Sequence, residues 1–486
     1  MTFPTLFSVG GARPLGAPIS KPTAWGQAVP PQRLSATLCR STARPILAAL
    51  LLAALGALPL AAAAPATRPH VIVVLADDMG IGDLSCYGGK QAPTPRIDRL
   101  AAEGTRFTQY YSAAPICSPS RCGIITGMYP ARWHITSFLQ TKKGNAGCEM
   151  ADFLDAKAPS LPRAMKAAGY ATAHFGKWHL GGGRDVADAP KFAAYGYDEN
   201  AGTYESPEPH PDITATNWIW SDKDKVKRWD RTAFFVDKTL DFLDRHRGAP
   251  CFINLWPDDV HTPWVPDEIS DKKDLPKNFH PVLAELDRQI GRLLDGLKSR
   301  GLEENTVVIF TSDNGALPTF DLARSGGFRG SKLELWEGGI RMPFIVRWPG
   351  RVPAGRVDDR TITCAVDLFP TIAAITGATL PPGHHVDGVD VSGAWRGGAA
   401  AKRGALFWEY GRNDEWFKFG PDRSPNVAVR RDNWKLLVNA DGSNAQLYNL
   451  ATDVKEASNL AASKPDLARE LTQLALDWRG SLSKKK

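Results

Sequence analysis

The sequence has few cysteines and no strongly basic segment before its last residues. Seven cysteines occur in 486 residues, and no spacing among them resembles a zinc site. No cysteine closely follows the apolar run at 46–64, so nothing supports a lipid anchor. The only basic run is Lys484–Lys486, which fits a solvated tail. These absences argue against a zinc protein, a lipoprotein and a nucleic-acid-binding protein.

The N-terminal region has the layout of a secretory signal. Arg40 and Arg44 precede the apolar run at 46–64, which contains glycine and proline and ends in alanines with an A-x-A-like site. We expect cleavage near Ala63–Ala66, an exported (periplasmic or secreted) protein and no stable membrane anchor. Residues 1–39 are rich in Pro, Gly and Ser, and are either an extension or the product of an upstream start codon.

Removal of this leader changes the charge of the protein. The whole chain has 59 basic and 52 acidic residues, and the leader to Ala66 carries five of the basic residues and none of the acidic ones. The mature chain therefore has 54 basic and 52 acidic residues and is nearly neutral. Its composition gives no reason to expect a nucleic-acid partner.

Short apolar runs alternate with helical patterns over most of the chain. The runs predict buried strands at Val71–Leu75, Ala171–Phe175, Phe252–Trp256, Val307–Phe310 and Phe344–Val346. The helical patterns lie at Pro95–Glu103, Ser160–Ala168, Asp230–His246 and Pro281–Ser299. This alternation predicts an α/β fold with a large, mostly parallel sheet flanked by helices.

Polar residues follow four of the predicted strands directly. Ligands of an open parallel sheet bind outside the carboxyl ends of its strands, so these residues are expected to converge on one edge. Ordinary solvated loops would not place charges suited to a metal or an anion after each of these strands. The segments are Asp77-Asp78, Gly176–His179, Asp258–His261 and Thr311–Gly315.

The sequence pattern changes after about residue 400. Short strands are predicted at Leu406–Trp408, Asn426–Arg430 and Trp434–Val438, followed by Leu447–Leu450 and a helix at Lys464–Trp478. This pattern predicts a smaller C-terminal α+β subdomain with an antiparallel sheet. We expect a leader at 1–66, a catalytic domain at 67–395 and the subdomain at 396–486.

The segment Cys117-Ser118-Pro119-Ser120-Arg121, followed by Thr126-Gly127, resembles the activation signature of the sulfatases. The pentapeptide alone is also compatible with a cysteine at the start of a helix, since short motifs recur by chance. Other segments resemble the family in the same order, so the resemblance spans roughly residues 70 to 460. Among them are Arg329–Lys332, Glu337–Arg341, Asp367–Thr371 and Trp434–Leu436.

The resemblance implies an alkaline phosphatase-like fold and a sulfuric ester hydrolase. In the family a formylglycine-generating enzyme oxidises the cysteine to an aldehyde, whose hydrate is the nucleophile. Met128 departs from the arginine that the family often has after Thr-Gly. With Cys117 converted and Cys39 in the leader, an odd number of cysteines remains, so at least one stays free or pairs between chains. The remaining cysteines are Cys86, Cys122, Cys148, Cys251 and Cys364.

Asp77, Asp78, Asp313 and Asn314 offer only oxygen ligands, which suit calcium or magnesium better than zinc. Neighbouring aspartates repel one another unless a cation lies between them. The resemblance implies that these four residues bind one calcium ion per chain, with the converted Cys117 also at the metal.

The remaining candidates are cations and histidines. Arg121, Lys177 and Lys332 are expected to bind the sulfate and to stabilise the charge that develops in the transition state. The resemblance places His261 near the leaving oxygen and His179 near the formylglycine hydroxyls, where each can exchange protons. His134 and Ser206 are weaker candidates for contact with the substrate and the nucleophile.

We therefore expect removal of sulfate from an organic sulfate ester by covalent catalysis. One hydroxyl of the hydrate attacks sulfur, His261 or Lys332 protonates the alcohol, and a base, His179, triggers release of sulfate. The alternatives are a phosphate mono- or diesterase of the same superfamily and a non-catalytic glycan-binding relative. A sulfated carbohydrate is the expected substrate, because tryptophans stack on sugar rings; the candidates are Trp133, Trp218, Trp220, Trp264 and Trp416.

Overall fold

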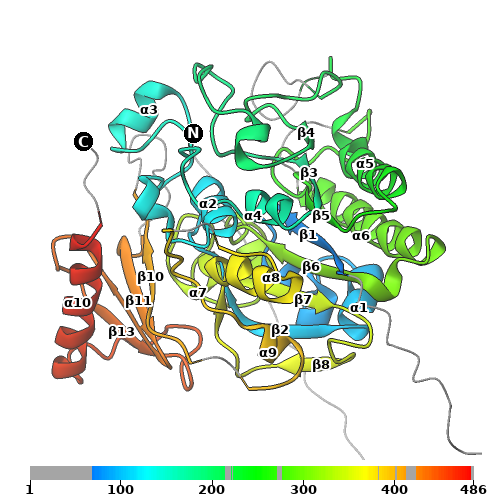
Figure 1. Cartoon of the computed structure of the whole chain (residues 1–486). Helices are drawn as coiled ribbons and strands as arrows, with labels where there is room; N and C mark the ends of the chain where they lie inside the picture. The colour runs from blue at the N-terminus through cyan, green and yellow to red at the C-terminus, as the bar shows by residue number, and fades with distance from the viewer. Residues whose placement is uncertain are drawn as a thin grey trace, which may run out of the picture. The chain divides into compact units, whose positions relative to one another are not determined.

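A nine-stranded sheet forms the centre of the computed structural model (Figure 1). The structure describes residues 68–213, 221, 223–270, 276–380, 383–399, 402–411 and 423–482. The sheet has the order β4-β3-β5-β1-β6-β7-β2-β8, and β9 pairs with β2. Its strands are β1 (His70–Ala76), β2 (Thr105–Tyr111), β3 (Ala171–Gly176), β4 (Glu199–Gly202), β5 (Cys251–Trp256), β6 (Thr306–Ser312), β7 (Arg341–Arg347), β8 (Arg356–Asp358) and β9 (Thr363–Cys364).

Only β7 runs against the other strands of this sheet. The pairs β4-β3, β3-β5, β5-β1 and β1-β6 are parallel, whereas β7 is antiparallel to both β6 and β2. The strands β3, β5, β1 and β6 are consecutive neighbours, and each is followed by one of the predicted polar segments. Their carboxyl ends therefore bring these segments to one edge of the sheet.

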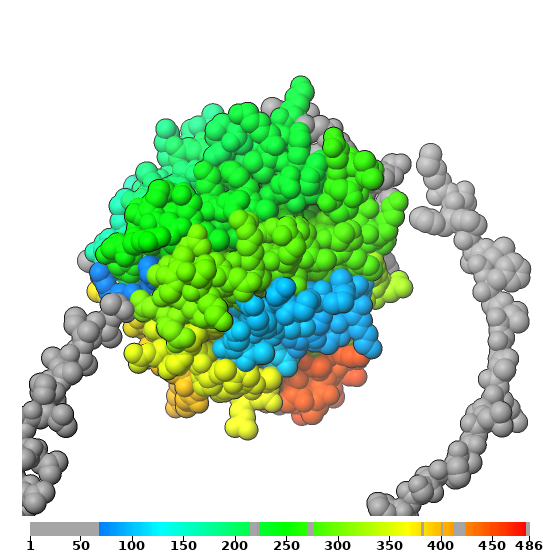
Figure 2. Space-filling model, turned by 90° about the vertical axis from the view of Figure 1, so that its right-hand side faces the viewer, coloured from blue at the N-terminus to red at the C-terminus, as the bar shows by residue number. Residues whose placement is uncertain are grey.

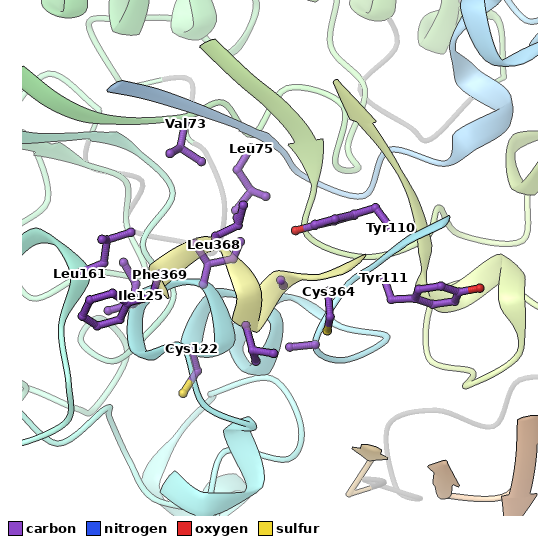
Figure 3. Packing of buried hydrophobic residues seen from close by; sticks show 14 of the residues in the cluster. Val73, Leu75, Tyr110, Tyr111, Cys122, Ile125, Leu161, Cys364, Leu368 and Phe369 are labelled. Carbon is purple, nitrogen blue, oxygen red and sulfur yellow. The ribbon is translucent and has the colours of Figure 1, made fainter. Parts of the chain in front are cut away.

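Helices cover both faces of the sheet, as the alternation of side chains along β1 requires. Val71, Val73 and Leu75 pack in one core with α2, α4 and α8, whereas Ile72 and Val74 pack in the other with α1, α5 and α6. Figure 3 shows Val73 and Leu75 facing residues of α2, α4 and α8. The helices are α1 (Pro95–Ala102), α2 (Cys117–Thr126), α3 (Lys142–Gly147), α4 (Leu161–Ala167), α5 (Arg231–Arg245), α6 (Pro276–Ser299), α7 (Glu337–Ile340), α8 (Leu368–Thr376), α9 (Ser392–Trp395) and α10 (Pro465–Gly480).

The second helical layer is built from amphipathic helices. Along α6, Leu283, Leu286 and Ile290 are buried at helical spacing, and the helix packs against α1 and α5. Figure 2 views this side, where the blue residues of α1 lie beside the green and yellow-green residues of α6. The buried stripe on one side of α6 explains why this face of the sheet is closed to water.

A second sheet of four antiparallel strands follows in the order β10-β11-β12-β13. Val427 and Val429 point toward α10, whereas Ala428 between them belongs to the same core as Val71 of β1. The small sheet therefore has no solvated face at its centre, and residues 65–486 form one compact unit. Its strands are β10 (Leu406–Glu409), β11 (Val427–Arg431), β12 (Trp434–Val438) and β13 (Gln446–Asn449).

A buried charge cluster joins the two sheets. Lys435 on β12 has no exposed side chain, and its Nζ lies 2.9 Å from Glu337 Oε1 of α7 and 2.9 Å from Glu456 Oε1. Burial alone would raise the pKa of Glu337, but Lys435, Arg341 and Arg430 hold it at about 2. The lysine is thus the shared counter-ion of two buried carboxylates.

Replacing Lys435 with methionine is expected to lower the free energy of unfolding by about 3–5 kcal/mol, because Glu456 loses the buried cation beside it and Glu337 keeps only its arginines. Urea unfolding followed by tryptophan fluorescence measures this. The matched control is Lys402→Met, since Lys402 is exposed, and it should change the free energy by less than about 0.5 kcal/mol. Equal stability of the two variants would contradict this account of the cluster.

The α/β fold with its mostly parallel sheet and the antiparallel C-terminal sheet are confirmed. The structure starts α6 at Pro276 rather than at the predicted Pro281, and Pro281 lies inside the helix. The strands β2, β4, β8 and β9 were not predicted. The division at 395/396 stays a prediction, and the leader at 1–66 lies outside the described residues.

No disulfide joins any two of the described cysteines. They are Cys86, Cys117, Cys122, Cys148, Cys251 and Cys364. Within the described ranges, no helix combines the length and apolar character needed to cross a bilayer.

Candidate active site

The acidic residues after β1 and β6 lie against one another because these two strands are neighbours. The backbone N–H of Asp78 donates to Asp313 Oδ1 at 3.1 Å, and Asn314 Nδ2 donates to Asp78 Oδ1 at 2.8 Å. All four residues, Asp77, Asp78, Asp313 and Asn314, are buried. The predicted cluster of oxygen donors thus forms at the carboxyl edge of the sheet.

Cys117 reaches this cluster from the first turn of α2. Its Sγ lies 3.9 Å from Asp78 Oδ1. One ligand atom each from Cys117, Asp77 and Asp313 lies within 4.8 Å of the others, and the same holds for Cys117, Asp78 and His261. Burial raises the pKa of the Cys117 thiol, so the unmodified thiol stays protonated.

Arg121 follows Cys117 by four residues, so both side chains lie on the same face of α2. Its guanidinium is fully buried and donates to Asp313 Oδ2 at 2.7 Å and to Asp77 Oδ1 at 3.0 Å. Its other terminal nitrogen, Nη1, donates to the carbonyl oxygen of Lys177 at 2.7 Å. Arg121 therefore holds together the segments that follow β1, β3 and β6.

Two lysines complete the charges around the carboxylates. Lys177 Nζ donates to Asp77 Oδ2 at 2.9 Å, and Lys332 Nζ donates to Asp78 Oδ2 at 2.6 Å. Burial alone would raise the pKa of Asp77, but Lys177, His261 and the other cations hold it well below its usual range. Burial raises the pKa of Asp313 to about 7, outweighing the attraction of Arg121, and the charges of Asp77 and Asp78 add to the rise.

His261 lies beside Lys332 and Asp78. Its Nε2 is 3.3 Å from Lys332 Nζ and 3.5 Å from Asp78 Oδ2, and its Nδ1 is 2.6 Å from the carbonyl oxygen of Thr262. Arg228 donates to the carbonyl oxygen of His261 at 2.8 Å and so fixes the loop after β5. Burial lowers the pKa of His261 to about 4.

His179 is buried. Among the described residues, it has no direct contact with the carboxylates of Asp77, Asp78 and Asp313. Its Nε2 lies 2.9 Å from the carbonyl oxygen of Leu139 and 3.3 Å from Glu205 Oε2. The backbone N–H of Leu139 donates to the hydroxyl of Ser118, the residue after Cys117, at 2.9 Å. His179 is therefore linked to the start of α2 through the backbone of a single residue, Leu139.

Two residues of the site have backbone conformations that non-glycine residues seldom adopt. The φ angles of Asp78 and His179 are 58° and 54°, in the left-handed region. Arg324 donates to the carbonyl oxygen of Asp78 at 2.8 Å and is itself paired with Asp83 at 2.9 Å. Strain held in place by such contacts is common at functional sites.

The carboxylates and the amide fit a hard cation. Asn314 Oδ1 is buried and accepts no hydrogen bond from a described residue, so it is an oxygen donor that needs a partner. The carboxylates of Asp77, Asp78 and Asp313 are the ligands that calcium prefers. Among the described histidines and cysteines, only His261 and Cys117 place a ligand atom close to these carboxylates.

The weaker candidates lie elsewhere or in other roles. The hydroxyl of Ser206 donates to the carbonyl oxygen of Thr203 at 2.7 Å, and His134 ends the short helix at Pro130–Trp133. The expectation that Trp264 stacks on a substrate is wrong, because its ring is fully buried against Phe279. Trp133 packs partly buried on the main core. Trp218, Trp220 and Trp416 lie outside the described residues.

Sequence patterns did not point to three residues that support the site, namely Glu205, Arg324 and Asp83. Glu205 is adjacent to the candidate Ser206, and Asp83 lies six residues after Asp77. Their roles depend on contacts between loops far apart in the sequence, such as Arg324 with Asp83. The only sequence signal for Glu205 and Asp83 was that each acidic residue lies close to a candidate site residue.

Comparison with known proteins agrees with this geometry. Residues 69–378 match the family model described as Sulfatase, and residues 330–477 match that of the N-sulphoglucosamine sulphohydrolase C-terminal region. An N-acetylgalactosamine-6-O-sulfatase of Bacteroides thetaiotaomicron is 29% identical, covering 84% of this chain and 92% of the relative. A steryl-sulfatase of Mus musculus is 32% identical, covering 76% of this chain and 72% of the relative.

A solved structure from work on glycosaminoglycan metabolism by Bacteroides thetaiotaomicron has the same fold. The TM-score is 0.69 at 26% sequence identity, with coverage of 85% of this chain and 100% of the other.

Proposed function

The chain belongs to the sulfatase family and is a sulfate ester hydrolase, and from this premise we propose that it desulfates a carbohydrate by means of a formylglycine made from Cys117 and a bound calcium ion. The observation that carries the proposal is the position of Cys117. Its side chain lies close to the carboxylates of Asp77, Asp78 and Asp313, at the edge of the sheet where four parallel strands end.

The charge of the site favours an anionic substrate once a divalent cation is bound. The buried carboxylates equal the buried cations in number, so the protein groups alone are close to neutral. A calcium ion would leave an excess of positive charge, which suits the negative charge of a sulfate ester and the further charge that develops on its leaving oxygen. The carboxylates are Asp77, Asp78 and Asp313, and the cations are Arg121, Lys177 and Lys332.

Calcium would be held by Asp77, Asp78, Asp313 and the free oxygen of Asn314. When bound, it would polarise the oxygens of the sulfate and lower the pKa of the nucleophile. Conversion of Cys117 would supply a carbon that carries two oxygens after hydration, one to attack sulfur and one to drive out sulfate. A cysteine thiol or a serine hydroxyl provides only one such group.

The side chains of this chain then have distinct tasks. Lys177 and Lys332 neutralise the oxygens of the sulfate, and Arg121 fixes the carboxylates that hold the metal. His261 and Lys332 lie 3.3 Å apart and can pass a proton to the leaving alcohol oxygen. His179 accepts the proton whose removal expels sulfate.

A carbohydrate is the substrate class that the relatives support best. One relative is named for N-acetylgalactosamine-6-sulfate and the structural relative comes from glycosaminoglycan metabolism. We also propose that a formylglycine-generating enzyme acts on the chain and that the chain is exported, as the segment at 40–66 indicates.

The test is release of free sulfate from sulfated oligosaccharides, run beside sulfate and phosphate esters of one alcohol. The sulfate ester should have the much higher kcat/KM, and mass spectrometry of the Cys117 peptide should show the aldehyde. Faster cleavage of the phosphate ester would indicate a phosphoesterase, and an unmodified thiol after coexpression with the activating enzyme would indicate a binding protein.

A further inference from the structure

Glu205 lies next to His179, and the sequence motifs described above give Glu205 no role. Both residues are buried, with 6% and 5% of their surfaces exposed. Glu205 Oε2 is 3.3 Å from His179 Nε2, and the backbone N–H of His179 donates to the carbonyl oxygen of Glu205 at 2.9 Å. Arg184 donates to the other carboxylate oxygen of Glu205 at 2.6 Å. The carboxylate is thus fixed on both sides.

Close packing of two loops makes this contact possible. Gly182 has a φ of +91°, and a Cβ at this position would lie 2.3 Å from the backbone nitrogen of Pro207. Glycine therefore lets the loop after β3 approach the segment that contains Glu205.

The contacts of His179 determine which ring nitrogen carries the proton. Both neighbours of Nε2, the Leu139 carbonyl oxygen and the Glu205 carboxylate, can only accept hydrogen bonds. Nε2 must therefore bear the hydrogen, and in the neutral ring Nδ1 is an acceptor. Burial lowers the pKa of His179 to about 3, which keeps the ring neutral.

Nδ1 of His179 is buried and accepts no hydrogen bond from a described residue. An unsatisfied acceptor in a buried site is costly unless a bound group donates to it. The ring is connected to Ser118, next to the nucleophile position, through the backbone C=O and N–H of Leu139. A hydroxyl on the converted Cys117 or on the substrate could donate the missing hydrogen bond to Nδ1.

On the basis of the proposed function, we infer that Glu205 is a positioning residue that fixes the Nε2–H tautomer of His179 and so makes Nδ1 the base that releases sulfate. In this step the O–H bond of the remaining hydroxyl breaks and its proton moves to Nδ1. The electrons of that bond form the carbonyl bond, while the bond from carbon to the sulfate oxygen breaks and sulfate leaves with its electron pair.

The first test reads the tautomer directly and needs neither formylglycine nor calcium. The measurement is a long-range ¹H–¹⁵N spectrum of the Cys117→Ala protein labelled with ¹⁵N-histidine. The chain has ten histidines, and the signals that disappear on His179→Gln substitution belong to His179. The expected result is a neutral ring with the proton on Nε2. A proton on Nδ1, or on both nitrogens at neutral pH, would overturn the inference. This outcome is independent of whether the enzyme releases sulfate.

The second test separates the two halves of the reaction in Glu205→Gln. The expected kcat for sulfate release falls by about 10–100-fold, since such orienting partners have effects of that size. Alcohol should appear in a burst of about one equivalent before slow release of sulfate, with little change in KM. The matched control is Glu199→Gln on β4, whose carboxylate pairs with the partly exposed Arg245.

Other results have distinct meanings. A raised KM with unchanged kcat would make Glu205 a substrate-binding residue, and an equal loss of both products without a burst would make it merely structural. Either result overturns the inference. A wild-type protein that releases no sulfate from any ester defeats the proposed function instead, while the tautomer measurement still stands on its own.

Discussion

Replacing Cys117 with serine is expected to lower the steady-state rate of sulfate release on the order of 10⁶-fold, the size of effect seen when a catalytic nucleophile is removed. Cys117 lies at the first position of α2, 3.9 Å from Asp78, so serine fits the space with little rearrangement. Serine offers one oxygen where the proposed chemistry needs two. The variant should therefore transfer at most one sulfo group per molecule and then keep it.

Sulfate release by ion chromatography, together with the intact mass of the protein, measures both parts of this prediction. Cys148→Ser is the control, because Cys148 is half-buried and lies outside the carboxylate cluster. It should retain full activity. Multiple turnovers by the Cys117→Ser variant would show that a single hydroxyl suffices, and the proposed chemistry would then be wrong.

Removal of the cation is expected to lower kcat at least about 1,000-fold, because a metal supplies several kcal/mol of transition-state stabilisation and each 1.36 kcal/mol is worth a factor of ten. Chelation followed by dialysis tests this with unaltered protein. Added calcium should restore activity better than magnesium, since the set of three carboxylates and one amide oxygen suits the larger ion.

The corresponding variant is Asp313→Asn, which removes one charged ligand and keeps the shape of the side chain. We expect a loss of the same order and weaker binding of calcium by calorimetry. Asp188→Asn is the matched control, because Asp188 is exposed and pairs only with the partly exposed Lys142 among the contacts described. Full activity of the chelated protein, or calcium binding unchanged in Asp313→Asn, would exclude this metal site.

Much of the fold was predictable because its strands are buried on both faces. β1, β3, β5 and β6 are mostly apolar and almost wholly buried, and the residues that follow them carry the charges of the site. β2 was missed because its sequence alternates, with Phe107 buried and Thr108 partly exposed. An alternating strand of seven residues gives a weaker signal than an apolar run.

The site was predictable only as far as local sequence determines it. The spacing of Cys117 and Arg121 places both on one face of a helix, so their cooperation follows from four residues of separation. The contact of Glu205 with His179 depends instead on the order β4-β3-β5 and on the packing of the glycine-rich loop after β3 against the segment after β4. The periodicity of apolar residues predicts neither the strand order nor the loop packing.

The core that the small sheet shares with the first strand has a consequence for how the protein is made. Val71 at the start of the folded part and Trp478 near its end share one core. The ribosome therefore releases almost the entire polypeptide before that core can close. A nascent or truncated chain that lacks β12 would hold Glu337 without its lysine and would expose an apolar surface, which makes such fragments prone to aggregate and to be degraded.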